Sequence, residues 1–151
     1  MCHLVLGVGL ALAPIGAYLA VTGSFAWLPL YISFAVLFWV AGFDMIYALQ
    51  DEEFDKKMGL SSIPAKIGRK ATLNLSVLFH IITASYLISA AYHASAGLLF
   101  WIGTVVFISL LIYQHLLVKP NDLSKVNLAF FTTNGIASVI FSIFVILSLY
   151  I

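Results

Sequence analysis

Residues 25–43 read FAWLPLYISFAVLFWVAGF and carry no charged side chain. A helix of about 20 residues crosses the ~30 Å hydrocarbon core of a bilayer, and this stretch has the length and the hydrophobicity to do so. Four more stretches share this character: Met1–Val21, Ala71–Tyr92, Ala96–Val118 and Val126–Ile151. Because the strands of a membrane barrel would be short and alternating, the sequence predicts an all-α integral membrane protein with five transmembrane helices.

The composition excludes the soluble classes of protein. Of the 151 residues, 63% are hydrophobic and 9% are charged, whereas a soluble domain is about one quarter charged. The mean hydropathy is +1.10. A formal net charge of +1 excludes a nucleic-acid-binding surface. The single cysteine, Cys2, excludes a disulfide framework and a cysteine-based zinc site.

The basic residues are confined to alternate connectors. The first and third connectors carry no charge, and all 7 basic residues lie in the second and fourth. They are Lys56, Lys57, Lys66, Arg69, Lys70, Lys119 and Lys125. In a five-helix serpentine the second and fourth connectors lie on the same side, and the positive-inside rule makes that side cytoplasmic. We therefore expect a multi-pass protein of a bacterial-type inner membrane, with a cytoplasmic N-terminus and an extracytoplasmic C-terminus.

The acidic residues gather at the start of the predicted cytoplasmic loop, residues 44–70. On a continuous helix, at ~100° per residue, Asp44, Asp51 and Asp55 lie within about 40° of one another. Three carboxylates on one face repel each other, and oxygen ligands without His or Cys suit Mg²⁺ or Ca²⁺. Asp51 and Asp55, one turn apart, could hold one metal ion between them. Asp44 lies deeper, at the membrane boundary, where a carboxylate normally faces a partner or a cavity.

Basic side chains come directly after these acids in the sequence. Lysine and arginine donate well to phosphate oxygens, so acids for a metal and bases for phosphate indicate a site for a lipid diphosphate at the cytoplasmic surface. The alternative is that charges beside a helix end simply anchor it at the interface.

The segment 44–68 carries a specific resemblance. Its sequence, DMIYALQDEEFDKKMGLSSIPAKIG, resembles the second aspartate-rich motif of the UbiA-type membrane prenyltransferases, of the form D-x-x-Y-A-x-x-D-x-x-x-D followed by S-I-P-A-[KR]-x-G. It is most similar to the 4-hydroxybenzoate polyprenyltransferases of quinone biosynthesis and to their menaquinone-pathway relatives. The segments YQHLLVKPNDLSKVN from Tyr113 and AFFTTNG from Ala129 resemble the same subgroup.

The resemblance implies a fold, a reaction and a set of roles. The five helices would be the last five of a nine-helix bundle. The reaction would be Mg²⁺-dependent transfer of a polyprenyl group from polyprenyl diphosphate to an aromatic acid such as 4-hydroxybenzoate. Asp51 and Asp55 would bind Mg²⁺, and Asp44 would either hold the metal set or orient the acceptor or a basic neighbour. Lys66 and Arg69 would contact the diphosphate. The ring of Tyr47 would face the allylic cation or serve in packing.

One part of the family pattern does not occur in this sequence. The family carries a first aspartate-rich motif, N-D-x-x-D-x-x-x-D, whereas no acidic residue precedes Asp44 here. We therefore expect the chain to be a C-terminal fragment whose partner is the N-terminal half of the fold, and the isolated chain to be impaired in activity. The alternatives are a carrier of divalent cations or small solutes and a catalytically silent assembly fragment.

The remaining polar residues of the apolar stretches have expected structural roles. The four histidines, His3, His80, His93 and His115, are scattered without the spacing of metal ligands, so we expect no metal-binding or pH-sensing role for them. The amides are expected to make interhelical hydrogen bonds; they are Asn74, Gln114, Asn127 and Asn134.

Overall fold

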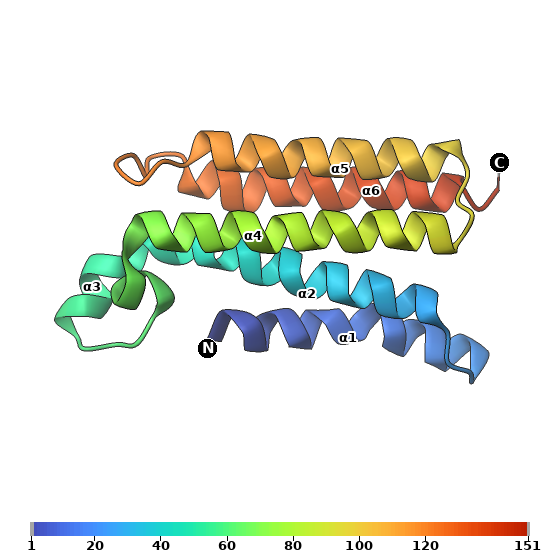
Figure 1. The fold of residues 1–151 in the computed structure, drawn as a ribbon, viewed down its shortest axis with the longest axis horizontal. Helices are drawn as coiled ribbons and strands as arrows, with labels where there is room; N and C mark the ends of the chain where they lie inside the picture. The colour runs from blue at the N-terminus through green and yellow to red at the C-terminus, as the bar shows by residue number, and fades with distance from the viewer. Residues whose placement is uncertain (1, 151) are drawn as a thin grey trace.

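The computed structural model describes residues 2–150 as a bundle of helices (Figure 1). The long helices are α1 (Cys2–Thr22), α2 (Trp27–Tyr47), α4 (Ile63–His93), α5 (Leu98–Leu117) and α6 (Asn134–Leu147). Three short elements complete the chain: η1 (Ala48–Asp51), α3 (Glu52–Lys57) and η2 (Leu128–Thr133), a π-helical segment that continues into α6. Among these residues, five helical spans are long and apolar enough to cross a membrane, so the predicted fold class is confirmed. Met1 and Ile151, which the predicted first and last helices include, lie outside the described residues.

Each long helix packs against the next long helix in the chain. Helix α2 packs against both α1 and α4, α4 packs against α5, and α5 pairs with α6 (Figure 1). Small residues allow the closest approaches. A Cβ atom on Gly7 would stand 2.6 Å from the backbone oxygen of Leu37, and one on Gly42 would stand 2.5 Å from the ring of His80. The backbones of α1 and α2 therefore touch at Gly7, and the His80 ring of α4 fills the space beside Gly42.

The predicted loop 44–70 is mostly helical, which corrects the sequence-based boundaries. Helix α2 continues through Asp44 to Tyr47, and α4 begins at Ile63 rather than at Ala71. The start of α4 is capped by Ser62, whose Oγ accepts a hydrogen bond from the amide of Ala65 at 3.3 Å. Charged residues in this segment lower its hydropathy without lowering its helix propensity. Hydropathy therefore located the part of each helix that lies in the hydrocarbon, not the whole helix.

Helix α4 bends near its start at Gly68. This residue has φ 78° and ψ 166°, a conformation open to glycine and outside the helical region. The turn 63–67 therefore precedes a sharp break, and the straight part of α4 begins at Arg69.

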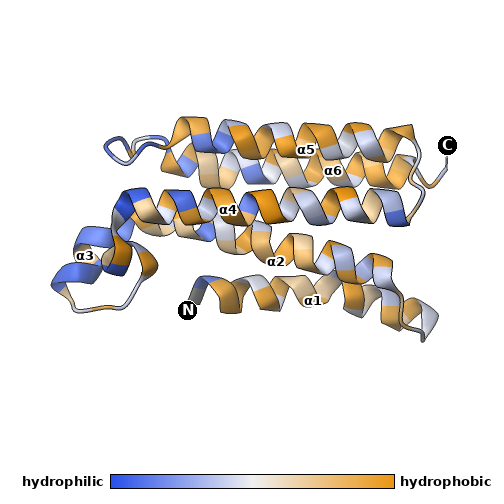
Figure 2. Cartoon of the chain, viewed as in Figure 1, coloured by the Kyte–Doolittle hydropathy of each residue, from blue (hydrophilic) through white to orange (hydrophobic). Residues whose placement is uncertain are grey.

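Polar residues concentrate at one end of the bundle. Figure 2 shows hydrophilic residues around α3, at the start of α4 and in the connector between α5 and η2. The N-terminus lies toward this end and the C-terminus lies at the other (Figure 1). The two charged connectors therefore share one end, as the five-helix serpentine requires.

Candidate functional site

The acidic segment changes helix type between Asp44 and Asp55. Residues Ala48–Asp51 form a 3₁₀ turn before α3. A 3₁₀ helix advances about 120° per residue instead of about 100°, so four such residues rotate α3 by about 80° relative to its position on a continuous α-helix. The continuous helix assumed from the sequence is therefore wrong. Within residues 2–150, no three His, Cys, Asp or Glu side chains come close enough to form a metal-ligating group.

Asp44 binds a histidine from the neighbouring helix. Its Oδ2 lies 2.6 Å from Nδ1 of His3, and the pair joins the start of α1 to the end of α2. The His3 side chain is only 6% exposed, whereas that of Asp44 is 21% exposed. The expectation that a deep carboxylate faces a partner is thus fulfilled, and the partner is a histidine to which the sequence assigned no role.

The signal for the His3–Asp44 contact lies in the hairpin register. Helices α1 and α2 are antiparallel and joined by the short connector 23–26. His3 and Asp44 are almost equally distant from this connector along the chain, so an antiparallel pairing brings them to the same level. Spacing along the sequence finds ligands on one helix and cannot find such a pair.

Asp51 and Asp55 present free carboxylates at the polar end. Asp51 is exposed and Asp55 is half-buried. Neither side chain enters a hydrogen bond or an ion pair with another of the described residues. Two unpaired carboxylates and water-accessible space fit Mg²⁺, which typically takes one or two carboxylates and completes its shell with water and phosphate.

The buried acid of this segment is Glu52, which the sequence pattern did not single out. Glu52 is 5% exposed and accepts from Nζ of Lys56 at 2.6 Å and from Nε of Arg69 at 2.5 Å. Nη2 of Arg69 also reaches Glu53 at 3.2 Å. Arg69 therefore ties α3 to the straight part of α4. Lys66, in the turn before Gly68, is exposed.

Aromatic side chains surround Tyr47, which lies one turn after Asp44 on α2. The Tyr47 ring stacks on Phe130 with centroids 4.2 Å apart and meets Phe131 edge-on at 5.9 Å. Both phenylalanines belong to the π-helical segment η2. A π-helix is rare in proteins, and where one occurs it is often at a functional site. Of the two roles predicted for Tyr47, packing is therefore present in the structure.

The predicted amide contacts are partly present. Nε1 of Trp39 donates to Oδ1 of Asn134 at 3.2 Å, which joins α2 to α6. The Gln50 amide donates to Oδ1 of Asn127 at 3.5 Å and links η1 to the second charged connector. Gln114 is fully buried, and neither its amide nitrogen nor its amide oxygen has a partner among the described residues.

The second charged connector has its own local order. Oδ1 of Asp122 accepts from the hydroxyl of Ser124 at 2.6 Å and from its backbone amide at 3.0 Å. These two bonds hold the pKa of the Asp122 carboxyl below its usual value. The carboxylate of Asp122 is thus hydrogen-bonded to a neighbouring residue, in contrast to those of Asp51 and Asp55.

Two further histidines meet inside the bundle. Nδ1 of His80 lies 2.8 Å from Nε2 of His115, and Nε2 of His80 lies 3.3 Å from the carbonyl oxygen of Trp39. The pair joins α4 to α5, and the contact with Trp39 extends it to α2. Scattered positions in the sequence thus converge in space, as a polar interhelical contact.

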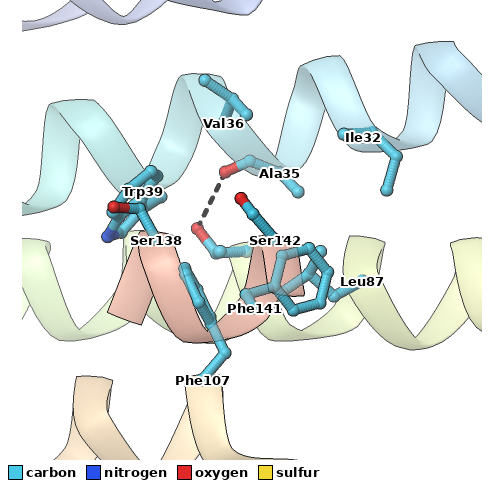
Figure 3. A pocket seen from close by; sticks show the side chains of 10 residues that line it. Ile32, Ala35, Val36, Trp39, Leu87, Phe107, Ser138, Phe141 and Ser142 are labelled. Carbon is cyan, nitrogen blue, oxygen red and sulfur yellow. Dashed lines mark hydrogen bonds between the residues drawn. The ribbon is translucent and has the colours of Figure 1, made fainter. Parts of the chain in front are cut away.

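An apolar cavity lies deeper in the bundle. It is partly open, has a volume of about 210 Å³ and lies between α2, α4, α5 and α6. Figure 3 shows Trp39, Phe107 and Phe141 around it. The polar groups at its wall include Thr83, whose hydroxyl donates to the carbonyl of Ala35 at 3.3 Å (Figure 3). Trp39 precedes Asp44 on α2 by about 7.5 Å along the helix axis, so the cavity begins on the membrane side of the acidic segment.

Comparison with known proteins identifies the family. The model of the UbiA prenyltransferase family matches residues 1–136. The chain therefore belongs to the UbiA prenyltransferase family, which is a family of membrane prenyltransferases. No curated protein and no solved structure matches the chain significantly.

Proposed function

We propose that this protein takes part in the Mg²⁺-dependent transfer of a polyprenyl group from polyprenyl diphosphate to an aromatic acceptor such as 4-hydroxybenzoate in quinone biosynthesis. The observation that carries the proposal is the pair of free carboxylates, Asp51 and Asp55, beside exposed bases at one end of a membrane bundle of this family. The neighbouring acids, Glu52 and Asp122, are occupied by protein donors.

The metal-binding residues in this proposal are Asp51 and Asp55. Bound Mg²⁺ would supply Lewis acidity toward the departing diphosphate. The protein's own contribution is to keep both carboxylates unpaired at an accessible surface, which Glu52 supports by taking up the charges of Lys56 and Arg69.

The diphosphate-binding residues are Lys66 and Arg69. Lys66 is exposed in the turn before Gly68. Arg69 bonds Glu52 through Nε and Glu53 through Nη2, and a guanidinium has further N–H groups for a phosphate oxygen. Preorganised positive groups of this kind stabilise the negative charge that builds on a leaving group.

The hydrocarbon part of the substrate fits the deeper cavity. Its wall is mostly apolar, and it lies on the membrane side of Asp44, where a polyprenyl chain is soluble. Tyr47, on the helix that carries Asp44, stacks on Phe130 of η2. The two rings supply aromatic surface for the positive charge that develops on the allylic carbon.

The proposed setting is a bacterial-type inner membrane with the polar end in the cytoplasm. All seven basic residues lie at or between the ends of helices on that side, as the positive-inside rule requires. The alternative of a transporter has no support from the fold, because all 6 acidic residues lie in segment 44–55 or at Asp122 and leave no acidic path across the bundle.

The test is prenyl transfer by the complete gene product in native-like membranes. We expect Asp51→Asn and Asp55→Asn each to lower Mg²⁺-dependent transfer from polyprenyl diphosphate to 4-hydroxybenzoate at least ~100-fold, because each removes a metal-ligating charge. Asp122→Asn is the matched control, since that acid is held by Ser124, and its transfer rate should stay near that of the unmodified protein. Near-normal transfer by both site variants would contradict the metal assignment.

A further inference from the structure

We propose that α3 is an interfacial helix whose apolar face inserts into the headgroup region of the bilayer at the polar end of the bundle. This apolar face consists of Phe54 and Met58, together with Leu60 of the turn that follows the helix. The inference goes beyond the proposed function and does not depend on it, because it rests on how α3 is attached to the bundle.

Helix α3 is attached to the bundle by its charged face. Glu52, which is 5% exposed, accepts hydrogen bonds from Lys56 of the same helix and from Arg69 of α4. Glu53 accepts a further hydrogen bond from Arg69, and α3 packs against α4 and η1. A helix on a water-exposed surface normally does the opposite, because it turns its apolar face toward the protein and its charges toward water.

The apolar side chains of α3 point away from this contact. At ~100° per residue, Phe54 lies about 160° from Glu52 around the helix axis and about 40° from Met58. The amide of Met58 donates to the carbonyl of Phe54, so the two residues belong to one helical turn. Phe54 is 61% exposed, Met58 is 63% exposed and Leu60 is 53% exposed. The described residues thus leave three large apolar side chains uncovered on neighbouring turns.

The position of α3 indicates what covers these side chains. Helix α2 lies in a span that is long and apolar enough to cross a membrane, and only the short element η1 separates it from α3. Figure 1 shows α3 at the end of the bundle where the charged connectors lie. A segment at this place adjoins the headgroups, where amphipathic helices bury their apolar faces by about 5–10 Å. The bilayer is therefore the apolar partner already at hand.

The residues that border the apolar face suit the same surroundings. Lys57 lies about 60° from Phe54 on one side; it is exposed and enters no ion pair with another described residue. A lysine in this position extends its ammonium group to lipid phosphates while its stem stays on apolar surface. Asp55 lies about 100° from Phe54 on the other side. Insertion of the apolar face therefore leaves the Asp55 carboxylate at the level of the lipid headgroups.

The other possible covers are water and protein, and each gives the surface a different accessibility. A side chain in lipid is reached by dissolved oxygen, which is apolar, and is poorly reached by a charged or strongly polar reagent. A side chain in water is reached by both reagents, and one packed against a second protein surface is reached by neither. Two reagents of opposite polarity therefore separate the three cases.

The experiment is electron paramagnetic resonance of the complete gene product in nanodiscs of phosphatidylethanolamine and phosphatidylglycerol, with one nitroxide label per variant in a Cys2→Ser background. Relative to free label in water, labels at Phe54→Cys and Met58→Cys should be at least about threefold more accessible to oxygen than to a water-soluble nickel chelate. Glu53→Cys is the matched control, because Glu53 is 75% exposed and should favour the nickel chelate. Ile81→Cys, 57% exposed on α4, is the reference for a label in lipid.

Leu60→Cys repeats the measurement outside the helix, so a label that disturbs α3 does not decide the result. The inference is overturned if the labels at the apolar face favour the nickel chelate as Glu53→Cys does, which would place this face in water. It is also overturned if neither reagent reaches them, which would place protein on the face. The proposed function is tested separately, since normal prenyl transfer by the Asp51 and Asp55 variants would remove the metal site and leave these accessibilities unchanged.

Discussion

Glu52 carries the charge that the fold buries, whereas its neighbour Glu53 carries one that stays in water. Glu52 has a 7% exposed side chain between Lys56 and Arg69, whereas the side chain of Glu53 is 75% exposed and has a single bond to Arg69. The same residue type thus has two roles one position apart. The ion-pair network at Glu52 fixes α3 and the start of α4 around the two free carboxylates.

We predict that Glu52→Gln lowers the free energy of unfolding by about 1–3 kcal/mol, because it leaves the charges of Lys56 and Arg69 without a carboxylate partner at a buried position. Glu53→Gln should change it by under ~0.5 kcal/mol, as for other exposed pairs. The measurement is denaturant unfolding in mixed micelles. Equal effects of the two substitutions would show that the network contributes no more than surface charge.

The sequence predicts which residues belong to the candidate site, but it does not predict which side chains they contact. The motif identified Asp44, Asp51 and Asp55 and located Lys66 and Arg69, because motif and charge are properties of the sequence itself. The partner of Asp44 is His3, from another helix, and the partner of Arg69 is Glu52. Such pairs depend on how helices dock and on a 3₁₀ turn that no residue in Ala48–Asp51 signals.

At the scale of the element, the packing of α1 against α2 depends on one of the three glycines of α1. Gly7 faces the Leu37 carbonyl, whereas Gly9 and Gly16 have no neighbouring atom within 4 Å of a built Cβ. The backbones of α1 and α2 therefore come close together only at Gly7. This contact, near the hydrogen bond between His3 and Asp44, fixes how the two helices are aligned.

Gly7→Ala should push α1 away from α2, since its Cβ would meet a backbone oxygen that cannot move aside. We expect a loss of about 1–3 kcal/mol in the free energy of unfolding. Gly9→Ala, on the same helix, should be neutral or slightly stabilising because alanine has the higher helix propensity. Thermal unfolding in detergent, followed by circular dichroism, compares the two. A Gly7→Ala protein as stable as Gly9→Ala would contradict the close approach.

The elements themselves were largely predictable, and their ends were less so. All five apolar stretches became helices, because length and hydropathy determine whether a segment can cross a bilayer. The ends failed at 44–47 and 63–70, where polar residues continue a helix beyond the hydrocarbon. The π-helical geometry of η2, whose Phe130 stacks on Tyr47, also has no signal in the sequence.

At the scale of the whole molecule, the charged connectors share one end of the bundle (Figure 2). By the positive-inside rule, this arrangement predicts which end of the bundle faces the cytoplasm. The orientation of the bundle is therefore as important to the proposed function as the identity of the site residues.

Cysteine labelling tests the orientation. In a Cys2→Ser background, we expect Ser61→Cys and Asn121→Cys to react with an impermeant maleimide only after spheroplasts are lysed, because both positions lie in the connectors proposed to be cytoplasmic. Ser24→Cys should react in intact spheroplasts. All three positions are exposed. The reverse pattern would place the polar end outside the cell and contradict the proposed cytoplasmic chemistry.

The two connectors at the far end, residues 23–26 and 94–97, contain no charged residue. Carrying one Lys, Arg or Asp through the middle of a bilayer costs about 2.5–3.5 kcal/mol on insertion scales. During synthesis, the hairpins α1–α2 and α4–α5 can therefore insert into the membrane as pairs, because no charged residue of their connectors has to cross the hydrocarbon core. The distribution of charge that would serve the proposed chemistry at one surface thus also lowers the energy barrier to membrane insertion at the other.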